Sequence, residues 1–197
     1  MSGDHAELPA AVRVRQLEDR VIAAGLTTDA ELDQILAGVY WTGSPANGAR
    51  MVARAWTDAG YAERLLADGN AAAAEFGFGA SSRGGSGYRL KAVQNTGRRH
   101  NLIVCTLCSC YPTSLLGPSP SWYKSFAYRS RAVREPRDVL AEFGLQLPAE
   151  TEIVVWDSSA ETRYLVVPAR PANCAGLGED ALASLVTRDG MIGTAAL

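Results

Sequence analysis

Three of the four cysteines of the chain lie within six residues, in the segment IVCTLCSCYP that spans residues 103–112. Cys105, Cys108 and Cys110 form the pattern C-x-x-C-x-C directly after a short apolar run. Thiolates are soft metal ligands, and a backbone that curls after the apolar run could bring all three to one point. The same curl would direct the backbone amides of Ser109 and Cys110 inward. We call residues 105–110 the cysteine claw, and its spacing favours a metal site.

Other uses of these thiols stay open on spacing alone. A structural zinc ion takes four ligands, mostly as two separated pairs, and here the fourth could be His100, Cys174 or a residue that the pattern does not identify. An iron–sulfur cluster also needs a fourth cysteine, for which only Cys174 is available. A disulfide between such close neighbours would be strained. A buried, inert cluster of cysteines is the remaining alternative.

The bulk composition is that of a globular protein. The chain has 197 residues, of which 47% are hydrophobic and 20% are charged, and its formal net charge is −2. This balance gives no indication of a nucleic-acid or membrane partner. The sequence shows neither a run of about 18 apolar residues nor a signal peptide. We therefore expect a cytoplasmic protein, in which close cysteines more often serve metal or redox chemistry than disulfides.

The elements that must position the claw fall into two predicted regions. Residues 1–76 are expected to form a helical N-terminal arm, with a capping box at Thr28 and Glu31. The Gly/Ser-rich loop at residues 77–87 predicts a boundary, and residues 77–197 are expected to form an α+β core. Within that core, β-branched and aromatic runs predict strands at residues 88–94, 101–105, 152–157 and 162–168. Helices are predicted near residue 122 and at residues 134–144 and 179–190.

The segment VCTLCSC resembles the metal-binding motif of nitrile hydratase α subunits, and the related γ subunit of thiocyanate hydrolase shares the same claw. Further segments resemble the family in the same order, at residues 54–69, 122–144, 160–171 and 186–194. The resemblance implies a layered αββα core with a helical arm. It also implies a hydro-lyase that hydrates a nitrile to the amide.

The resemblance further implies the metal and its ligands. The metal would be a low-spin, non-corrin Co(III), held by the sulfurs of Cys105, Cys108 and Cys110 and by the amide nitrogens of Ser109 and Cys110. Threonine at position 106 is typical of the cobalt branch of the family, so Fe(III) is less expected. Cys108 would be oxidised to a sulfinic acid and Cys110 to a sulfenic acid.

In the implied reaction the trivalent metal polarises the nitrile, and the oxidised Cys110 attacks the nitrile carbon or acts as a base for water. The hydroxyl of Ser109 would lie close to this site, although a serine here also suits a turn. In the family, two arginines of a partner subunit donate to the oxidised sulfurs. We therefore expect β-type nitrile hydratase subunits and a maturation activator as partners, with the arm wrapping around a partner or forming a self-contained cap.

Two charged residues are predicted to lie close to the metal ligands. Glu161 and Arg163 lie two residues apart on a predicted strand and so should face the same side. The family places the glutamate near the metal loop, whereas an exposed ion pair would be the alternative. The basic residues of the helical segment that follows the claw are expected to form a solvated or interface face: Lys124, Arg129, Arg131, Arg134 and Arg137.

The chain departs from the family directly after the claw. Thr113 and Ser114 stand where Trp and Pro are common, and the tryptophan lies by the substrate in relatives. Its loss leaves room and adds a hydroxyl, which predicts a bulkier and more polar nitrile, such as the nucleoside nitrile toyocamycin. A thiocyanate hydrolase subunit is the alternative enzyme, and a zinc- or iron-binding protein without catalysis is the third possibility.

Overall fold

The chain divides into two units, Met1–Trp41 and Thr42–Leu197. The structure is a computed structural model, and it describes residues 9–40, 43–79 and 87–197. Most of the predicted boundary loop, at residues 80–86, lies outside the described residues. No helix in the described part of the chain is both long and apolar enough to cross a membrane.

The first unit contributes the helices α1 (Ala10–Ala23) and α2 (Asp29–Tyr40). The predicted capping box opens α2, because the Thr28 amide donates to Glu31 Oε2 at 2.9 Å and the Glu31 amide donates to Thr28 Oγ1 at 3.2 Å. Helix α1 buries no residue, and Val14 and Leu17 are 63% and 60% exposed. The helical prediction for this segment is therefore confirmed, and α1 presents apolar side chains outward.

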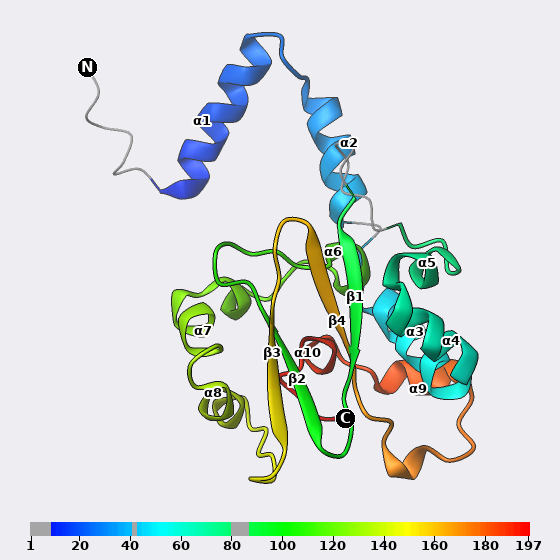
Figure 1. Cartoon of the computed structure of the whole chain (residues 1–197). Coiled ribbons are helices and arrows are strands. Elements are labelled where there is room, and N and C mark those ends of the chain that lie inside the picture. Colours follow the sequence, from blue (N-terminus) through cyan, green and yellow to red (C-terminus); the bar gives the residue numbers. More distant parts are fainter. Residues whose placement is uncertain (1–8, 41–42, 80–86) are drawn as a thin grey trace. The chain divides into compact units, whose positions relative to one another are not determined.

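In the described residues of the second unit, four strands form two parallel pairs (Figure 1). Strand β1 (Arg89–Gln94) pairs with β4 (Thr162–Val167), and β2 (Arg99–Val104) pairs with β3 (Glu152–Asp157). Helices surround these pairs: α3 (Pro45–Thr57), α4 (Ala59–Ala67), α5 (Gly69–Ala74), α6 (Thr113–Leu116), α7 (Phe126–Arg131), α8 (Pro136–Glu142), α9 (Glu179–Leu185) and α10 (Arg188–Ile192), with short 3₁₀ turns at Ser121–Lys124 and Ala172–Cys174.

The layers follow from which helix packs on which strand. Helices α4 and α5 pack on β1, α10 packs on β4, and α8 packs on β3, so the two strand pairs lie between two groups of helices (Figure 1). The predicted α+β class with a layered αββα core is confirmed.

Two predicted boundaries differ from the structure. The sequence predicts a division at residues 76 and 77, whereas α3, α4 and α5 belong to the unit that contains the strands. Their apolar faces explain this, because Met51, Tyr61 and Leu65 are fully buried in the shared core. The helix predicted at residues 179–190 is also interrupted, because Val186 is extended and Thr187 caps α10 by accepting a hydrogen bond from the Gly190 amide.

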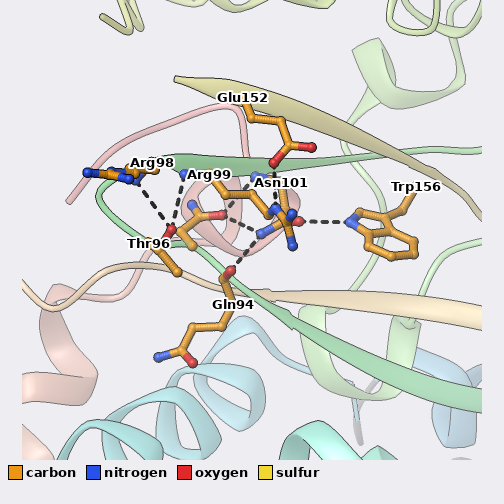
Figure 2. A network of polar contacts seen from close by, with 8 residues as sticks. Gln94, Thr96, Arg98, Arg99, Asn101, Glu152 and Trp156 are labelled. Carbon is orange, nitrogen blue, oxygen red and sulfur yellow. Dashed lines mark hydrogen bonds and ion pairs between the residues drawn. The ribbon is translucent and has the colours of Figure 1, made fainter. Parts of the chain in front are cut away.

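A polar network ties the start of β2 to its neighbours (Figure 2). The side-chain amide of Asn101 donates to the Gln94 carbonyl at 2.8 Å and to Asn95 Oδ1 at 2.9 Å. Its oxygen accepts from Trp156 Nε1 at 2.9 Å. At the edge of the network, Arg99 Nε lies 2.9 Å from the Glu152 carboxylate. These contacts join β1, β2 and β3 and so fix the strand that leads into the claw.

Candidate metal centre

The three cysteines meet directly after β2. The sulfurs of Cys105 and Cys108 lie 3.4 Å apart, and those of Cys108 and Cys110 lie 3.2 Å apart. All three lie within 4.8 Å of one another, and within the described ranges this is the group of His, Cys, Asp or Glu side chains placed to hold a metal. Two sulfurs about 2.3 Å from a metal would be about 3.2 Å apart at right angles and about 3.8 Å apart in a tetrahedron. The spacing therefore fits ligands at right angles better than a tetrahedral zinc site.

The three thiols differ in burial and in pKa. Cys105 and Cys110 are buried, whereas Cys108 is exposed. Hydrogen bonds from the thiols of Cys110 and Cys105 lower the pKa of Cys108 to about 7. Burial raises the pKa of Cys110 to about 11, although Arg163 opposes this rise. Metal binding requires thiolates, so Cys108 is the first of this pair to be ready for a metal.

Backbone amides of the claw also act on its exposed cysteine. The amides of Ser109 and Cys110 both favour the thiolate form of Cys108 and so lower its pKa. The Ser109 side chain is exposed. These two amides therefore lie close to the Cys108 sulfur.

The first turn of the claw is held by Asp157, a residue that the sequence pattern did not single out. Asp157 ends β3, and its carboxylate accepts from the Thr106 amide at 2.9 Å and from the Thr106 hydroxyl at 2.6 Å. Val104 pairs with Asp157 in the β2–β3 register, so the carboxylate stands beside the point where β2 becomes the claw. The sequence did contain a signal for this role, because Asp157 is an acidic residue at the end of the strand predicted at residues 152–157.

A second segment, residues 121–131, donates to backbone carbonyls of the claw and its flanks. The Tyr128 hydroxyl donates to the Ile103 carbonyl at 2.5 Å, and the Tyr123 hydroxyl donates to the Cys110 carbonyl at 3.0 Å. Between them, Arg129 Nη1 donates to the Cys108 carbonyl at 2.9 Å. The two tyrosines also pack against each other and against Trp122, which keeps the segment in place.

The basic residues after the claw, predicted to form a solvated or interface face, make different contacts within the chain. Arg129 turns to the claw, whereas Arg131 forms ion pairs with Glu135 at 3.2 Å and Glu142 at 2.7 Å. Arg137 instead donates to backbone carbonyls, including that of Thr151 at 2.7 Å. Sequence position alone could not separate these three directions.

Arg163 and Glu161 are placed differently. Arg163 lies in β4, favours the thiolate form of Cys110, and stacks over the Tyr88 ring with its guanidinium carbon 5.2 Å from the ring centroid. Its Nε and Nη1 are buried and lack a hydrogen-bond partner among the described residues. Glu161 precedes β4, is exposed, and accepts from the Ser159 hydroxyl at 2.8 Å. These contacts do not include the claw, so a role of Glu161 beside the metal ligands stays a prediction.

The two residues at the family's Trp-Pro position open α6, and both are half-buried. The Ser114 hydroxyl lies 2.9 Å from the Tyr88 hydroxyl, and the Ser114 carbonyl accepts from the side chain of Asn47 at 2.9 Å. Thr113 approaches Gly43 so closely that a Cβ at position 43 would lie 2.2 Å from the Thr113 carbonyl oxygen. Tyr88 thus links Ser114 to Arg163, and through it to Cys110.

Comparison with known proteins extends over nearly the whole chain. The family profile described as nitrile hydratase, alpha chain, matches residues 8–195. The low-molecular weight cobalt-containing nitrile hydratase subunit alpha of Rhodococcus rhodochrous is 47% identical over 183 residues, which cover 93% of this chain and 86% of that subunit. The thiocyanate hydrolase subunit gamma of Thiobacillus thioparus is 46% identical over 161 residues, which cover 77% of this chain and 65% of that subunit.

A solved structure shows the same fold. A variant of the Fe-type nitrile hydratase from Comamonas testosteroni Ni1 superposes with a TM-score of 0.89 at 39% sequence identity. The match covers 96% of this chain and 92% of that chain. The similarity in sequence and in structure therefore includes the strands, the claw and the helices around them.

Proposed function

The chain belongs to the nitrile hydratase α-chain family, whose members are subunits of hydro-lyases, and from this membership we propose that it hydrates a bulky, polar nitrile to the amide at a low-spin Co(III) centre. The observation that carries the proposal is the convergence of the Cys105, Cys108 and Cys110 sulfurs at 3.4 and 3.2 Å. Cobalt is favoured by the cobalt-containing relative and by Thr106. Fe(III) is the second candidate metal, since an Fe-type structure shares the fold.

The proposed ligands are the sulfurs of Cys105, Cys108 and Cys110 and the amide nitrogens of Ser109 and Cys110. The set is supported by the close approach of the three sulfurs and by the lowered pKa of Cys108, to which the amides of Ser109 and Cys110 contribute. When bound, the metal supplies Lewis acidity that polarises the nitrile. The chain itself holds the claw through Asp157 and the segment at residues 121–131.

Oxidation of Cys108 to a sulfinic acid and of Cys110 to a sulfenic acid is part of the proposal. It is supported by the two buried N–H groups of Arg163, which have no partner within the described residues and lie beside Cys110. A buried donor left without an acceptor costs about 1–3 kcal/mol, and an oxygen on Cys110 would accept from it. The proposed catalytic groups are the oxidised Cys110, acting as nucleophile or base, and Ser109 beside it.

The substrate assignment rests on Thr113 and Ser114. We propose that Thr113 and Ser114 line the substrate pocket, where the family commonly has Trp and Pro. Both are half-buried, and the Ser114 hydroxyl lies 2.9 Å from the Tyr88 hydroxyl, so this proposed wall would carry hydroxyl groups in place of an indole. A large nitrile with polar substituents, such as the nucleoside nitrile toyocamycin, suits this wall. Thr113→Trp should lower kcat/KM for large nitriles at least about tenfold relative to acetonitrile, because lost pocket volume acts on the larger substrate. An unchanged ratio would remove this assignment.

The partners proposed are β-type nitrile hydratase subunits and a maturation activator, in a cytoplasmic enzyme. The apolar residues that α1 leaves exposed support an arm, within residues 1–76, that packs on a partner. Co-production with the neighbouring β-type subunit and cobalt, followed by amide analysis over a panel of nitriles, tests the function. Absence of amide from every nitrile, with cobalt bound, would contradict it.

Thiocyanate hydrolysis is the second candidate, because the thiocyanate hydrolase γ subunit is 46% identical over the matched region. An anionic substrate favours a cationic wall, and Thr113 and Ser114 offer only hydroxyl groups. The same preparation assayed with thiocyanate separates the two activities, since release of ammonia from thiocyanate without amide from nitriles would favour the second candidate.

A further inference from the structure

Arg129 makes a contact with the claw that differs in kind from those of the two tyrosines beside it. Its Nη1 donates to the Cys108 carbonyl at 2.9 Å, and a longer contact of 3.4 Å reaches the Leu107 carbonyl. The Cys108 carbonyl belongs to the peptide unit whose nitrogen is the amide of Ser109. A positive charge therefore lies at the oxygen end of the peptide unit that joins Cys108 to Ser109.

The charge of Arg129 makes its hydrogen bond to the claw a strong one. The residue is half-buried, and its Nε is buried with no hydrogen-bond partner in the part of the chain that the structure describes. Hydrogen bonds from ionised donors are about twice as strong as neutral ones. Arg129 also lies on α7, which Tyr128 anchors to the Ile103 carbonyl.

The chemistry of an amide ligand explains what such a charge can do. A backbone nitrogen that binds a metal without its proton leaves the peptide unit with a negative charge, which nitrogen and oxygen share. A guanidinium on the oxygen offsets that charge and draws electron density away from the nitrogen. The neutral hydroxyls of Tyr123 and Tyr128 contact carbonyls outside this peptide unit, so they fix the loop without this effect.

We propose that Arg129 is a positioning residue that holds the Cys108–Ser109 peptide unit and compensates the negative charge that it carries as a metal ligand. This inference rests on the proposed function, because it assumes that the Ser109 nitrogen is a ligand. Arg129 touches neither substrate nor reacting atoms and acts through the claw. Its role differs from that of a purely structural residue because the charge, and not only the hydrogen bond, matters.

A series of substitutions separates charge from hydrogen bonding. Arg129→Lys keeps the charge, Arg129→Gln keeps a neutral donor, and Arg129→Met removes both. Arg134→Gln is the matched control, because Arg134 is an exposed arginine five residues further along the chain. Each variant is co-produced with the β-type subunit and cobalt. The readouts are the cobalt content, the sulfur-to-cobalt charge-transfer absorption, and the rate of cobalt loss to excess EDTA.

We expect the Gln and Met variants to lose cobalt about tenfold faster than wild type, because both lose the positive charge that compensates the ligated peptide unit. Their charge-transfer band should move to shorter wavelength, because a nitrogen relieved of the guanidinium is a stronger donor. The Lys variant should stay close to wild type in both properties, and Arg134→Gln should match wild type.

A band that stays at one wavelength in all loaded variants would overturn the inference, even if cobalt content falls in each. Equal losses in the Lys, Gln and Met variants would also overturn it, because a structural role alone predicts them. If the Met variant does not fold, the comparison of Lys with Gln gives the same decision. Wild-type protein that binds no cobalt would instead contradict the proposed function.

Discussion

Strand β2 has polar groups at both of its ends. Those at one end are hydrogen-bonded to each other, whereas some of those at the other end lack a hydrogen-bond partner among the described residues. At the Arg99 end, Asn101 satisfies its side chain against Gln94, Asn95 and Trp156 (Figure 2). At the Val104 end, the buried donors of Arg163 and Arg129 retain N–H groups without a partner among the described residues. The same strand therefore joins a closed hydrogen-bond network to an incomplete one.

The difference indicates which end serves stability and which serves function. Buried polar groups in folded proteins are nearly always paired, so a closed network fixes one arrangement of the strands. Buried donors that remain without an acceptor are expected where another group completes the site. Arg163 and Arg129 both lie against the claw, where the oxygens of modified cysteines and the charge of a ligated peptide would complete them.

The largest expected effect comes from the incomplete end. Cys110→Ser should remove cobalt binding and lower nitrile hydration at least about a thousandfold, because a hydroxyl neither replaces a soft thiolate ligand nor forms the sulfenic acid. Cobalt content and amide production measure this. Cys174→Ser is the control, since Cys174 is also buried but lies outside the claw. Equal loss in both variants would show that the claw has no special role.

The closed end should respond in stability. Asn101→Ala removes three side-chain hydrogen bonds and leaves Trp156 Nε1 and the Gln94 carbonyl without their partner, so we expect a loss of about 2–4 kcal/mol in the free energy of unfolding. Denaturant unfolding of the complete complex measures this. Glu152→Gln breaks only an exposed ion pair and should cost less than about 1 kcal/mol. Similar costs for the two variants would contradict a closed, cooperative network.

Substitution of Arg163, at the incomplete end, should affect activity more than stability, in contrast to substitution of Asn101. Arg163→Met should change the stability of the unmodified chain by less than about 1 kcal/mol, because the loss of stacking on Tyr88 offsets the removal of unpaired buried donors. In the matured enzyme it should lower the yield of oxidised Cys110 and reduce activity at least about tenfold. Peptide mass spectrometry and amide assays measure both. A large loss of stability with full oxidation would assign Arg163 to the fold alone.

The smallest effect concerns His100, which extends the closed network. Its Nε2 lies 2.6 Å from the Gly193 carbonyl oxygen, and its Nδ1 lies 3.3 Å from Asn95 Nδ2. Burial lowers the pKa of His100 below its unfolded value of 6.5, although the Gly193 contact opposes this shift. The unfolded chain therefore binds the proton first, so stability is complete above pH 6.5 and decreases as the pH falls through the window below it.

His100→Gln should flatten this dependence between pH 7 and pH 5, because glutamine does not titrate there. Tm measured across that range is the test, and the slope of Tm against pH should be smaller in the variant. Identical slopes would mean that other groups control the pH dependence.

Much of this arrangement could be predicted from the sequence. The claw was identified because cysteine spacing is local, and the four strands because β-branched runs mark them. The roles of Asp157 and Arg129 were missed, since each depends on which neighbour a side chain meets across the fold. The basic run as a whole did not indicate that Arg129 contacts the claw, because residues in one run point to different partners. The placement of α3–α5 with the strands was missed for a similar reason, because it depends on burial across the sheet.

Metal analysis with peptide mass spectrometry, on the chain purified with a β-type subunit and supplied with cobalt, tests directly whether the claw holds cobalt on oxidised cysteines. We expect about one cobalt per chain, with about three added oxygens on the peptide that carries Cys108 and Cys110, two from a sulfinic and one from a sulfenic acid. Zinc on three unmodified thiols in that same preparation would contradict it.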